Sequence, residues 1–211
     1  MSRISKLLVV FLAFLGILIN TLQSDNVLES FSYYTLQSNL WVLLFFGFLL
    51  FYQTKDTYSK PVSIVKFVIT VGIMITMVIY HFALRPLLDG MEDIDFLVGD
   101  LRDLLLHYFV PLAVLIDFFI DRKMQRFSLR KVFFVIILPL SYLLYTIIYT
   151  SFGGQYHLGE TIYNYPYFFL DLETYGYIGV FGWSLMIIGL YLLVAMILMK
   201  MYQFTMRQYK T

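Results

Sequence analysis

The chain has 211 residues, of which 60% are hydrophobic and 14% are charged, and its formal net charge is +1. Because soluble domains carry about 25% charged residues, this composition excludes an ordinary water-soluble domain, and the balanced charge gives no indication of a nucleic-acid partner. The sequence contains no cysteine, which excludes a disulfide framework, a thiol nucleophile and a cysteine-ligated metal.

Six segments are apolar and long enough, or nearly so, to cross a membrane, which takes about 20 residues of α-helix. Lipid offers no partner for backbone amides, so such segments must be helical. No linker or internal repeat separates them, and we predict a single all-α domain over residues 1–211, a transmembrane bundle of six helices. The predicted spans are Leu7–Leu22, Phe31–Tyr52, Val62–Leu84, Leu104–Ile120, Val132–Ser151 and Gly176–Tyr202.

Basic residues indicate the orientation of this bundle. With this arrangement of spans, all Lys and Arg except Arg85 and Arg102 fall on the side that carries the two termini. An excess of Lys and Arg marks the cytoplasmic side, so both termini are predicted to be cytoplasmic. Arg3 and Lys6 precede the first apolar run, and no A-x-A-like cleavage site follows it, which favours a retained first helix over a signal peptide.

The second predicted span begins with three polar residues at helical spacing. Thr35, Ser38 and Asn39 stand at positions i, i+3 and i+4, so they share one face of the helix. Polar side chains in a spanning helix point into the bundle, where they either hydrogen-bond a neighbouring helix or build a functional site. At 1.5 Å per residue, Thr35 is predicted to lie roughly 6 Å below the start of this helix at Phe31.

The fourth predicted span, whose apolar run is short, carries an ionisable residue inside its outer boundary. Placing the His107 side chain at this depth costs free energy unless it faces the bundle interior or a water-filled cavity. Asp103 precedes it by one turn and is expected to orient the imidazole, while Pro111 withholds an N–H from the carbonyl of His107 and is expected to kink the helix. The alternative is a packed, hydrogen-bonded histidine, with Asp103 only complementing the helix dipole.

Thr35 and His107 are predicted to lie at a similar depth, because both helices run inward and His107 is about 5–10 Å below its helix start. A threonine hydroxyl is unreactive alone, but a histidine within hydrogen-bond reach can take its proton as it attacks. The two residues together are therefore the minimum for nucleophilic catalysis.

Other polar residues supply candidate supporting positions. His81 and Arg85 are four residues apart at the outer end of the third span. Arg85 either extends to lipid phosphate or holds a substrate carboxylate, for which its planar fork is suited. The last outer loop is aromatic from Tyr163 to Asp171, which suits an interfacial lid. Asp117, near the cytoplasmic end of the fourth span, is expected to pair with a Lys or Arg of an inner loop.

Four short stretches resemble the androgen-induced and androgen-dependent membrane proteins and their bacterial six-helix relatives. Their order, spacing and helix layout agree over nearly the whole chain. The stretches are Phe31–Asn39, Tyr80–Arg85, Leu106–Pro111 with Asp117, and Tyr165–Tyr167 with Asp171. The animal members are threonine hydrolases that cleave fatty acid esters of hydroxy fatty acids inside the membrane. The resemblance implies Thr35 as nucleophile and His107 as its histidine. It is nearer to the bacterial branch, which implies the bacterial plasma membrane.

The preferred hypothesis is a membrane-embedded hydrolase of lipid esters. In it Thr35 attacks, His107 is the general base, and the partners are membrane lipids or fatty acid esters. Ser38, Asn39 or His81 is expected to donate to the oxyanion, and Arg85 to hold a free carboxylate. The remaining supporting residues are Asp103, Tyr165 and Asp171. No cofactor is implied, and the 3 His residues show no paired spacing with acids that favours a metal.

The alternative is a non-catalytic membrane protein, either a lipid-binding protein or a small-solute transporter, that uses the same polar cluster. A transporter is expected to show inverted repeats and polar residues that continue to the inner side. The sequence shows no repeat and little polarity below Asn39, which disfavours transport but not lipid binding. A purely structural scaffold is a third possibility.

Overall fold

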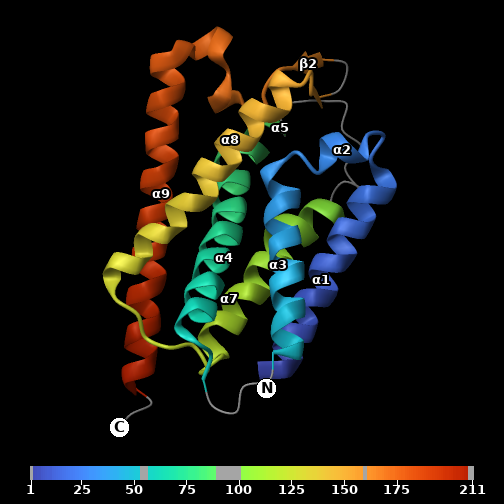
Figure 1. The fold of residues 1–211 in the computed structure, drawn as a ribbon. Helices are drawn as coiled ribbons and strands as arrows, with labels where there is room; N and C mark the ends of the chain where they lie inside the picture. Colours follow the sequence, from blue (N-terminus) through green and yellow to red (C-terminus); the bar gives the residue numbers. More distant parts are fainter. Residues whose placement is uncertain (1, 53–56, 89–100, 159–160, 209–211) are drawn as a thin grey trace.

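The structure is a computed structural model and describes residues 2–52, 57–88, 101–158 and 161–208. Within these residues it has six helices that are long and apolar enough to cross a membrane, which confirms the predicted helical bundle at that level. Both termini lie at the same end of the bundle (Figure 1). The six helices are Arg3–Gln23, Tyr34–Phe51, Lys60–Leu84, Leu101–Ile120, Leu129–Ser151 and Leu172–Thr205.

Short turns and a two-stranded hairpin complete the described fold. The elements are α1 (Ser2–Gln23), α2 (Val27–Ser30), α3 (Tyr34–Phe51), α4 (Lys60–Ile79), the π-helical turn η1 (Tyr80–Leu84), α5 (Arg85–Leu88), the π-helical turn η2 (Leu105–Phe109), α7 (Val110–Ile120), the 3₁₀ turn η3 (Leu129–Ile136), α8 (Ile137–Ser151), β1 (Tyr156–Leu158), β2 (Thr161–Tyr163), the 3₁₀ turn η4 (Phe168–Leu170) and α9 (Leu172–Gln208). The strands β1 and β2 pair antiparallel, with Tyr156 opposite Tyr163.

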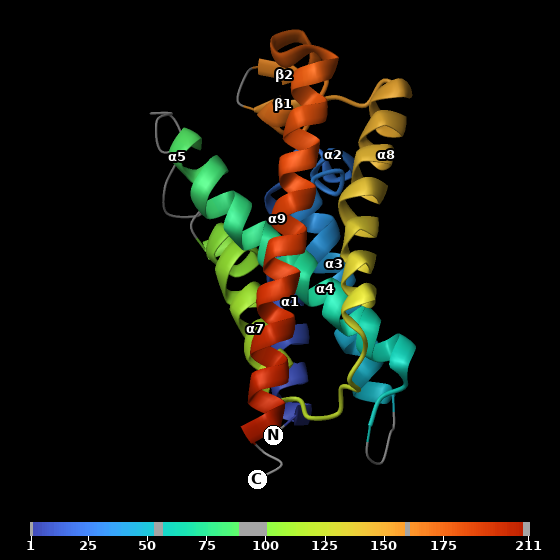
Figure 2. The ribbon, with the colours of Figure 1, turned by 90° about the vertical axis from the view of Figure 1, so that its left-hand side faces the viewer.

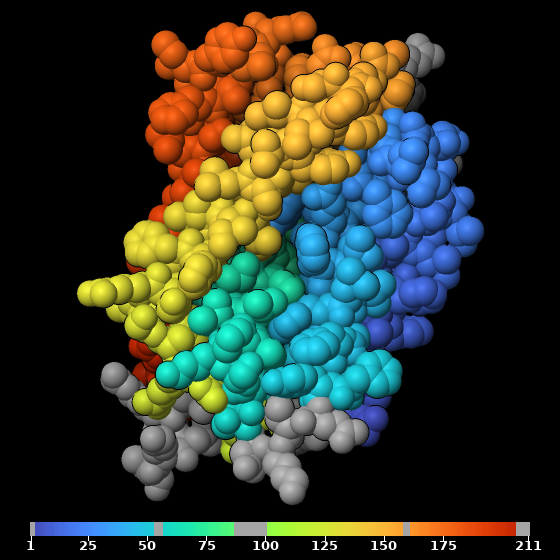
Figure 3. All heavy atoms as spheres, in the orientation of Figure 1, coloured from blue at the N-terminus to red at the C-terminus, as the bar shows by residue number. Residues whose placement is uncertain are grey.

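The six spans pack unequally. α1 packs against α3 and α7, and α4 contacts α3, α7 and α9. In the most apolar stretch of each span, 61% of the third span is buried but only 22% of the fifth and 11% of the last. Figure 1 shows α9 on the side of the bundle opposite α1, Figure 2 shows α9 running along the bundle with α8 beside it, and Figure 3 shows α8 lying obliquely across the face between α9 and α3. The third and fourth spans are therefore the most buried, and α8 and α9 expose most of their surface, while Tyr191, Ala195 and Leu198 of α9 pack into a buried cluster with α4.

The second span begins later than predicted. Residues 27–30 form the separate helix α2, whose first turn is capped by the side chain of Asn26. Tyr33 is extended, with φ −76° and ψ 142°, and α3 starts at Tyr34. Thr35 is therefore the second residue of its helix, and the predicted depth of 6 Å below a start at Phe31 is wrong. The fourth span conversely starts earlier, at Leu101.

Pro111 acts together with a π-helical turn. The N–H of Val110 reaches back five residues to the carbonyl of Leu105, so the carbonyl of Leu106 loses its ordinary partner. Pro111 has no N–H to offer the carbonyl of His107. Two successive carbonyls are thus released beside the histidine, one more than the sequence pattern alone predicts. Such π-helical turns are frequent at functional sites.

Candidate functional site

Thr35 and His107 are in contact in the interior of the bundle. The Thr35 Oγ1 atom lies 3.2 Å from the His107 Nε2 atom. Both residues are buried, with exposed fractions of 9% and 7%. α3 and η2 supply them from segments 72 residues apart in the chain. The hydroxyl and the imidazole that the sequence places at one depth are thus within hydrogen-bond reach of each other.

The other ring nitrogen of His107 determines how this contact is made. His107 Nδ1 lies 3.1 Å from the backbone carbonyl oxygen of Asp103. Because a carbonyl can only accept, Nδ1 carries the proton in the neutral ring and donates it there, which leaves Nε2 as an acceptor for the Thr35 hydroxyl. The ring also stacks on Tyr80, with centroids 3.7 Å apart and planes 10° apart. The imidazole is thus held in both tautomer and orientation.

Asp103 orients His107, as predicted, but it does so through its backbone carbonyl and not through its carboxylate. Helical side chains lean toward the N-terminus, so the ring meets the backbone of the preceding turn. The carboxylate of Asp103 instead accepts a hydrogen bond from the Tyr80 hydroxyl at 3.3 Å and contacts Arg102 at 3.4 Å. Asp103 therefore holds His107 directly through its carbonyl and braces the stacked Tyr80 through its carboxylate.

Ser38 and Asn39 support the backbone of Thr35. Asn39 Nδ2 donates to the carbonyl of Thr35 at 2.8 Å and to the released carbonyl of Leu106 at 3.2 Å. Ser38 Oγ donates to the carbonyl of Thr35 at 3.0 Å. The same Ser38 Oγ atom lies 2.9 Å from Thr76 Oγ1 on α4. Both amide hydrogens of Asn39 are thus engaged, so this side chain joins α3 to η2 and is not placed as the expected oxyanion donor.

Replacing Asn39 with leucine is expected to destabilise the protein by about 1–3 kcal/mol, because it removes both donors and leaves the Leu106 carbonyl buried without one. Ser38→Ala serves as the matched control and is expected to cost less, since the Thr35 carbonyl keeps its bond from Asn39. Chemical unfolding of the purified variants in detergent measures both. Equal losses for the two variants would show that Asn39 does not join the helices.

The N-terminal turn of α3 contacts the segment between β2 and α9, which contains Tyr167. The backbone N–H of Tyr34 donates to the Tyr167 hydroxyl at 3.1 Å, and the side chain of Tyr33 makes no capping hydrogen bond. Burial raises the pKa of the Tyr167 phenol, and hydrogen bonds with Thr35 and Tyr34 oppose that rise. First-turn amides have no carbonyl of their own helix to bond, and they form the positive end of the helix dipole. Thr35 therefore sits where negative charge is favoured.

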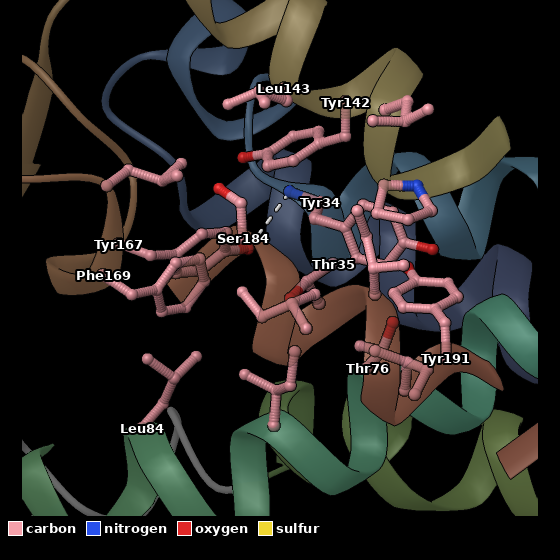
Figure 4. Close-up of a pocket in the computed structure, with 17 residues that line it drawn as sticks. Tyr34, Thr35, Thr76, Leu84, Tyr142, Leu143, Tyr167, Phe169, Ser184 and Tyr191 are labelled. Atoms are coloured by element: carbon pink, nitrogen blue, oxygen red, sulfur yellow. Dashed lines mark hydrogen bonds between the residues drawn. The ribbon is translucent and has the colours of Figure 1, made fainter. Parts of the chain in front are cut away.

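A narrow cavity of about 80 Å³ borders Thr35. α3, α4, α8, α9 and η4 enclose it, and Figure 4 shows the rings of Tyr142, Tyr167 and Tyr191 grouped around it. Thr35 lines this cavity and His107 does not, so His107 contacts the Thr35 hydroxyl from the side away from the cavity. No charged side chain lines the cavity among the described residues. An uncharged, chain-like ligand matches such a lining.

His81 and Arg85 lie apart from the Thr35–His107 pair. His81 is exposed, and its Nδ1 lies 2.9 Å from the Tyr108 hydroxyl, to which Arg85 Nη1 also donates at 3.5 Å. The structure does not place His81 as an oxyanion donor. Arg85 immediately follows Leu84, which lines the cavity, but Arg85 does not itself line it.

In the segment between β2 and α9, the predicted residues Tyr165 and Asp171 do not line the cavity, whereas Tyr167 does. Asp171 accepts hydrogen bonds from the backbone N–H groups of Glu173 at 2.8 Å and Thr174 at 3.0 Å, which makes it the N-cap of α9. Hydrogen bonds with Thr174 hold the pKa of Asp171 below its ordinary value. Burial, then a hydrogen bond to Asp171, raises the pKa of Tyr165 to about 12. This pair shapes the loop, and Tyr167 is the residue that reaches the site.

The end of the bundle that carries the termini holds a buried charge cluster formed by Lys6, Lys66, Asp117 and Asp121. Lys66 Nζ lies 2.6 Å from Asp117 and 2.6 Å from Asp121. Lys6 Nζ lies 3.1 Å from Asp117 and 2.8 Å from Asp121. Asp117 thus pairs with lysines inside α1 and α4, and the expected partner in an inner loop is wrong. The expectation of little polarity below Asn39 is wrong as well.

An apolar layer separates this charge cluster from Thr35 and His107. The layer is formed by residues of α1, α3, α4 and α7 that lie along each helix between the charge cluster and the level of Thr35 and His107. Its buried members are Val9, Ala13, Val42, Phe46, Ile69, Ile73, Val110, Ala113 and Val114. The described helices therefore show two polar levels with an apolar barrier between them.

Comparisons with protein-family models, with curated proteins and with solved structures found no match. In the part of the chain that the structure describes, no three His, Asp or Glu side chains gather as metal ligands.

Two residues were not predicted from the sequence: Tyr80, whose ring stacks on His107, and Asp121, the second carboxylate of the buried charge cluster. The available signal for Asp121 was its position four residues after Asp117, where it caps the end of α7.

Proposed function

We propose that the chain is a membrane-embedded threonine hydrolase that acts on lipid esters. The observation that carries the proposal is the 3.2 Å contact between Thr35 Oγ1 and His107 Nε2 at the wall of an apolar cavity. A nucleophile beside a base that a third group orients is the arrangement that covalent catalysis requires. The family resemblance of the sequence supports the same two residues.

In this proposal His107 Nε2 takes the proton of the Thr35 hydroxyl as Oγ1 attacks the ester carbonyl carbon. The tetrahedral oxyanion collapses with cleavage of the ester bond, and the imidazolium gives its proton to the departing alcohol. Water then attacks the acyl-Thr35 ester, with neutral His107 as base, and releases the fatty acid and free Thr35. The carbonyl of Asp103 accepts the Nδ1 hydrogen throughout.

Stabilisation of the oxyanion falls to the first turn of α3. Backbone N–H groups aimed at a developing negative charge are commonly a large term in acyl transfer. Thr35 is itself in that turn, so an oxyanion formed on a carbonyl attacked by Oγ1 develops close to the positive helix end. Ser38 and Asn39 act in this proposal as positioning residues, because their donors serve the carbonyls of Thr35 and Leu106.

The proposed substrate enters from the lipid and places an acyl chain in the cavity. α8 and α9 both line the cavity and expose most of their surface on the outside of the bundle, which supports this sideways route. Fatty acid esters of hydroxy fatty acids fit the proposal if their free carboxylate stays outside the uncharged cavity, near Arg85. The excess of Lys and Arg at the end with both termini supports cytoplasmic termini, and the membrane we propose is the bacterial plasma membrane.

Labelling with an alkyl fluorophosphonate tests the proposal on the purified protein in detergent. The expected result is one covalent adduct per chain, mapped to Thr35 by peptide mass spectrometry, together with hydrolysis of a fluorogenic fatty acyl ester. Correctly folded protein that neither labels nor hydrolyses any lipid ester would contradict the hydrolase. The cavity would then be assigned to lipid binding without catalysis.

A further inference from the structure

A second cavity lies at the end of the bundle that carries the termini. Its volume is about 500 Å³, and it lies between the start of α4 and the segment that joins α7 to η3. Lys60, Arg126 and Lys131 line it from these separate segments, together with the hydroxyl-bearing Ser128. We call these four residues and their surroundings the basic pocket.

The three cations of the basic pocket make no ion pair with a carboxylate among the described residues, although Lys131 Nζ lies 4.9 Å from the centroid of the Phe134 ring. The described carboxylates at this end, Asp117 and Asp121, already pair with Lys6 and Lys66 in the buried charge cluster. The three basic side chains of the pocket are exposed. Three cations around one cavity favour an anionic ligand, and phosphate oxygens accept hydrogen bonds from Lys, Arg and Ser side chains alike.

The remaining walls of the basic pocket are apolar. Pro61, Ile64 and Phe127 complete its lining. Beside it on α4 and η3 are large exposed hydrophobic side chains: Val65 is 43% exposed, Leu129 61% and Phe133 61%. A cavity with cations next to an exposed apolar surface, at the level where the third and fifth spans begin, matches a headgroup with its acyl chains better than a free anion.

We propose that the basic pocket binds the headgroup of an anionic phospholipid. Its phosphate lies among Lys60, Arg126 and Lys131, and the glycerol and first acyl carbons lie against Pro61, Ile64 and Phe127. Basic pockets between spanning helices on the cytoplasmic side are suited to such headgroups. The lipid joins α4 to η3 from outside and is separate from the cavity beside Thr35.

The test is binding of dioleoylphosphatidylglycerol to the purified full-length protein in dodecyl maltoside, followed by native mass spectrometry. The triple variant Lys60→Gln/Arg126→Gln/Lys131→Gln is expected to weaken binding roughly a hundredfold, since each cation near anionic lipid is worth about 1 kcal/mol. The matched control Arg3→Gln/Arg130→Gln/Lys200→Gln removes the same charge from exposed positions at the same end outside the pocket. It is expected to change binding only slightly.

Two outcomes would overturn the proposal. Equal weakening by the two triple variants would show that the general positive charge of this end, and not the pocket, attracts the lipid. Full displacement of the lipid by millimolar inorganic phosphate would show a free-anion site with no contribution from the acyl chains. Retention of lipid by wild type and by the control variant in phosphate, with loss from the pocket variant, supports the headgroup site.

Discussion

Replacing Thr35 with alanine is expected to abolish fluorophosphonate labelling and to reduce lipid-ester hydrolysis to background. The variant removes the hydroxyl whose Oγ1 atom contacts His107 Nε2, and with it the oxygen that the proposal uses to form the acyl intermediate. His107→Ala is expected to lower hydrolysis by about 10²–10⁴-fold, the usual contribution of a positioned general base. The measurement is the initial rate with a fluorogenic acyl ester, alongside gel detection of the label.

Two controls separate catalysis from folding in this experiment. Thr35→Ser keeps the nucleophilic oxygen and is expected to retain labelling at a reduced rate. Thr21→Ala removes a threonine hydroxyl that donates to the carbonyl of Ile17 in its own helix and is expected to leave the rate unchanged. All variants are compared by thermal unfolding in detergent. Labelling that persists in well-folded Thr35→Ala would assign the nucleophile to another residue.

The sequence predicts the spans well because their signal is additive. Each span accumulates apolar residues over about 20 positions, so single errors at the ends do not hide it. The ends themselves depend on local hydrogen bonds. The separate helix α2 exists because the side chain of Asn26 accepts from the Glu29 N–H and Tyr33 is extended, and hydropathy is insensitive to both.

The candidate site is only partly predictable, because it depends on contacts between helices. Helical spacing places Thr35, Ser38 and Asn39 on one face, and counting residues places His107 near their depth. The rotation of each helix about its axis decides whether the two side chains meet, and packing sets that rotation. The π-helical turn at Leu105–Phe109 changes the rotation locally, and a pattern based on 3.6 residues per turn does not include it.

The buried charge cluster shows the same limit most clearly. Lys6, Asp117 and Asp121 look like residues of a helix boundary, where charge is common. Packing of α1, α4 and α7 instead buries them, with at most 4% of any side chain in the cluster exposed. Burial raises the pKa of Asp121, but Lys66 and Lys6 outweigh this effect and hold it well below the ordinary value. This carboxylate is therefore ionised at neutral pH.

Lys66→Met is expected to lower the free energy of unfolding by about 3–5 kcal/mol, because it leaves two carboxylates buried beside a single lysine. Methionine keeps most of the side-chain length, so the loss reports the missing charge and not a cavity. Chemical unfolding in detergent at neutral pH measures it. The exposed Lys200 on α9 provides the matched control, since Lys200→Met is expected to change stability by less than about 0.5 kcal/mol.

A second substitution distinguishes a charge effect from a packing effect. The double variant Lys66→Met/Asp121→Asn restores neutrality, because Lys6 and Asp117 remain as a pair 3.1 Å apart. It is expected to recover most of the stability that Lys66→Met loses, since replacing a whole buried ion pair is often nearly neutral. If the double variant is no more stable than the single one, packing at Lys66 and not the unpaired charge explains the loss. Recovery would instead show that the cluster fixes α1, α4 and α7 through charge balance, below the level at which Thr35 and His107 meet.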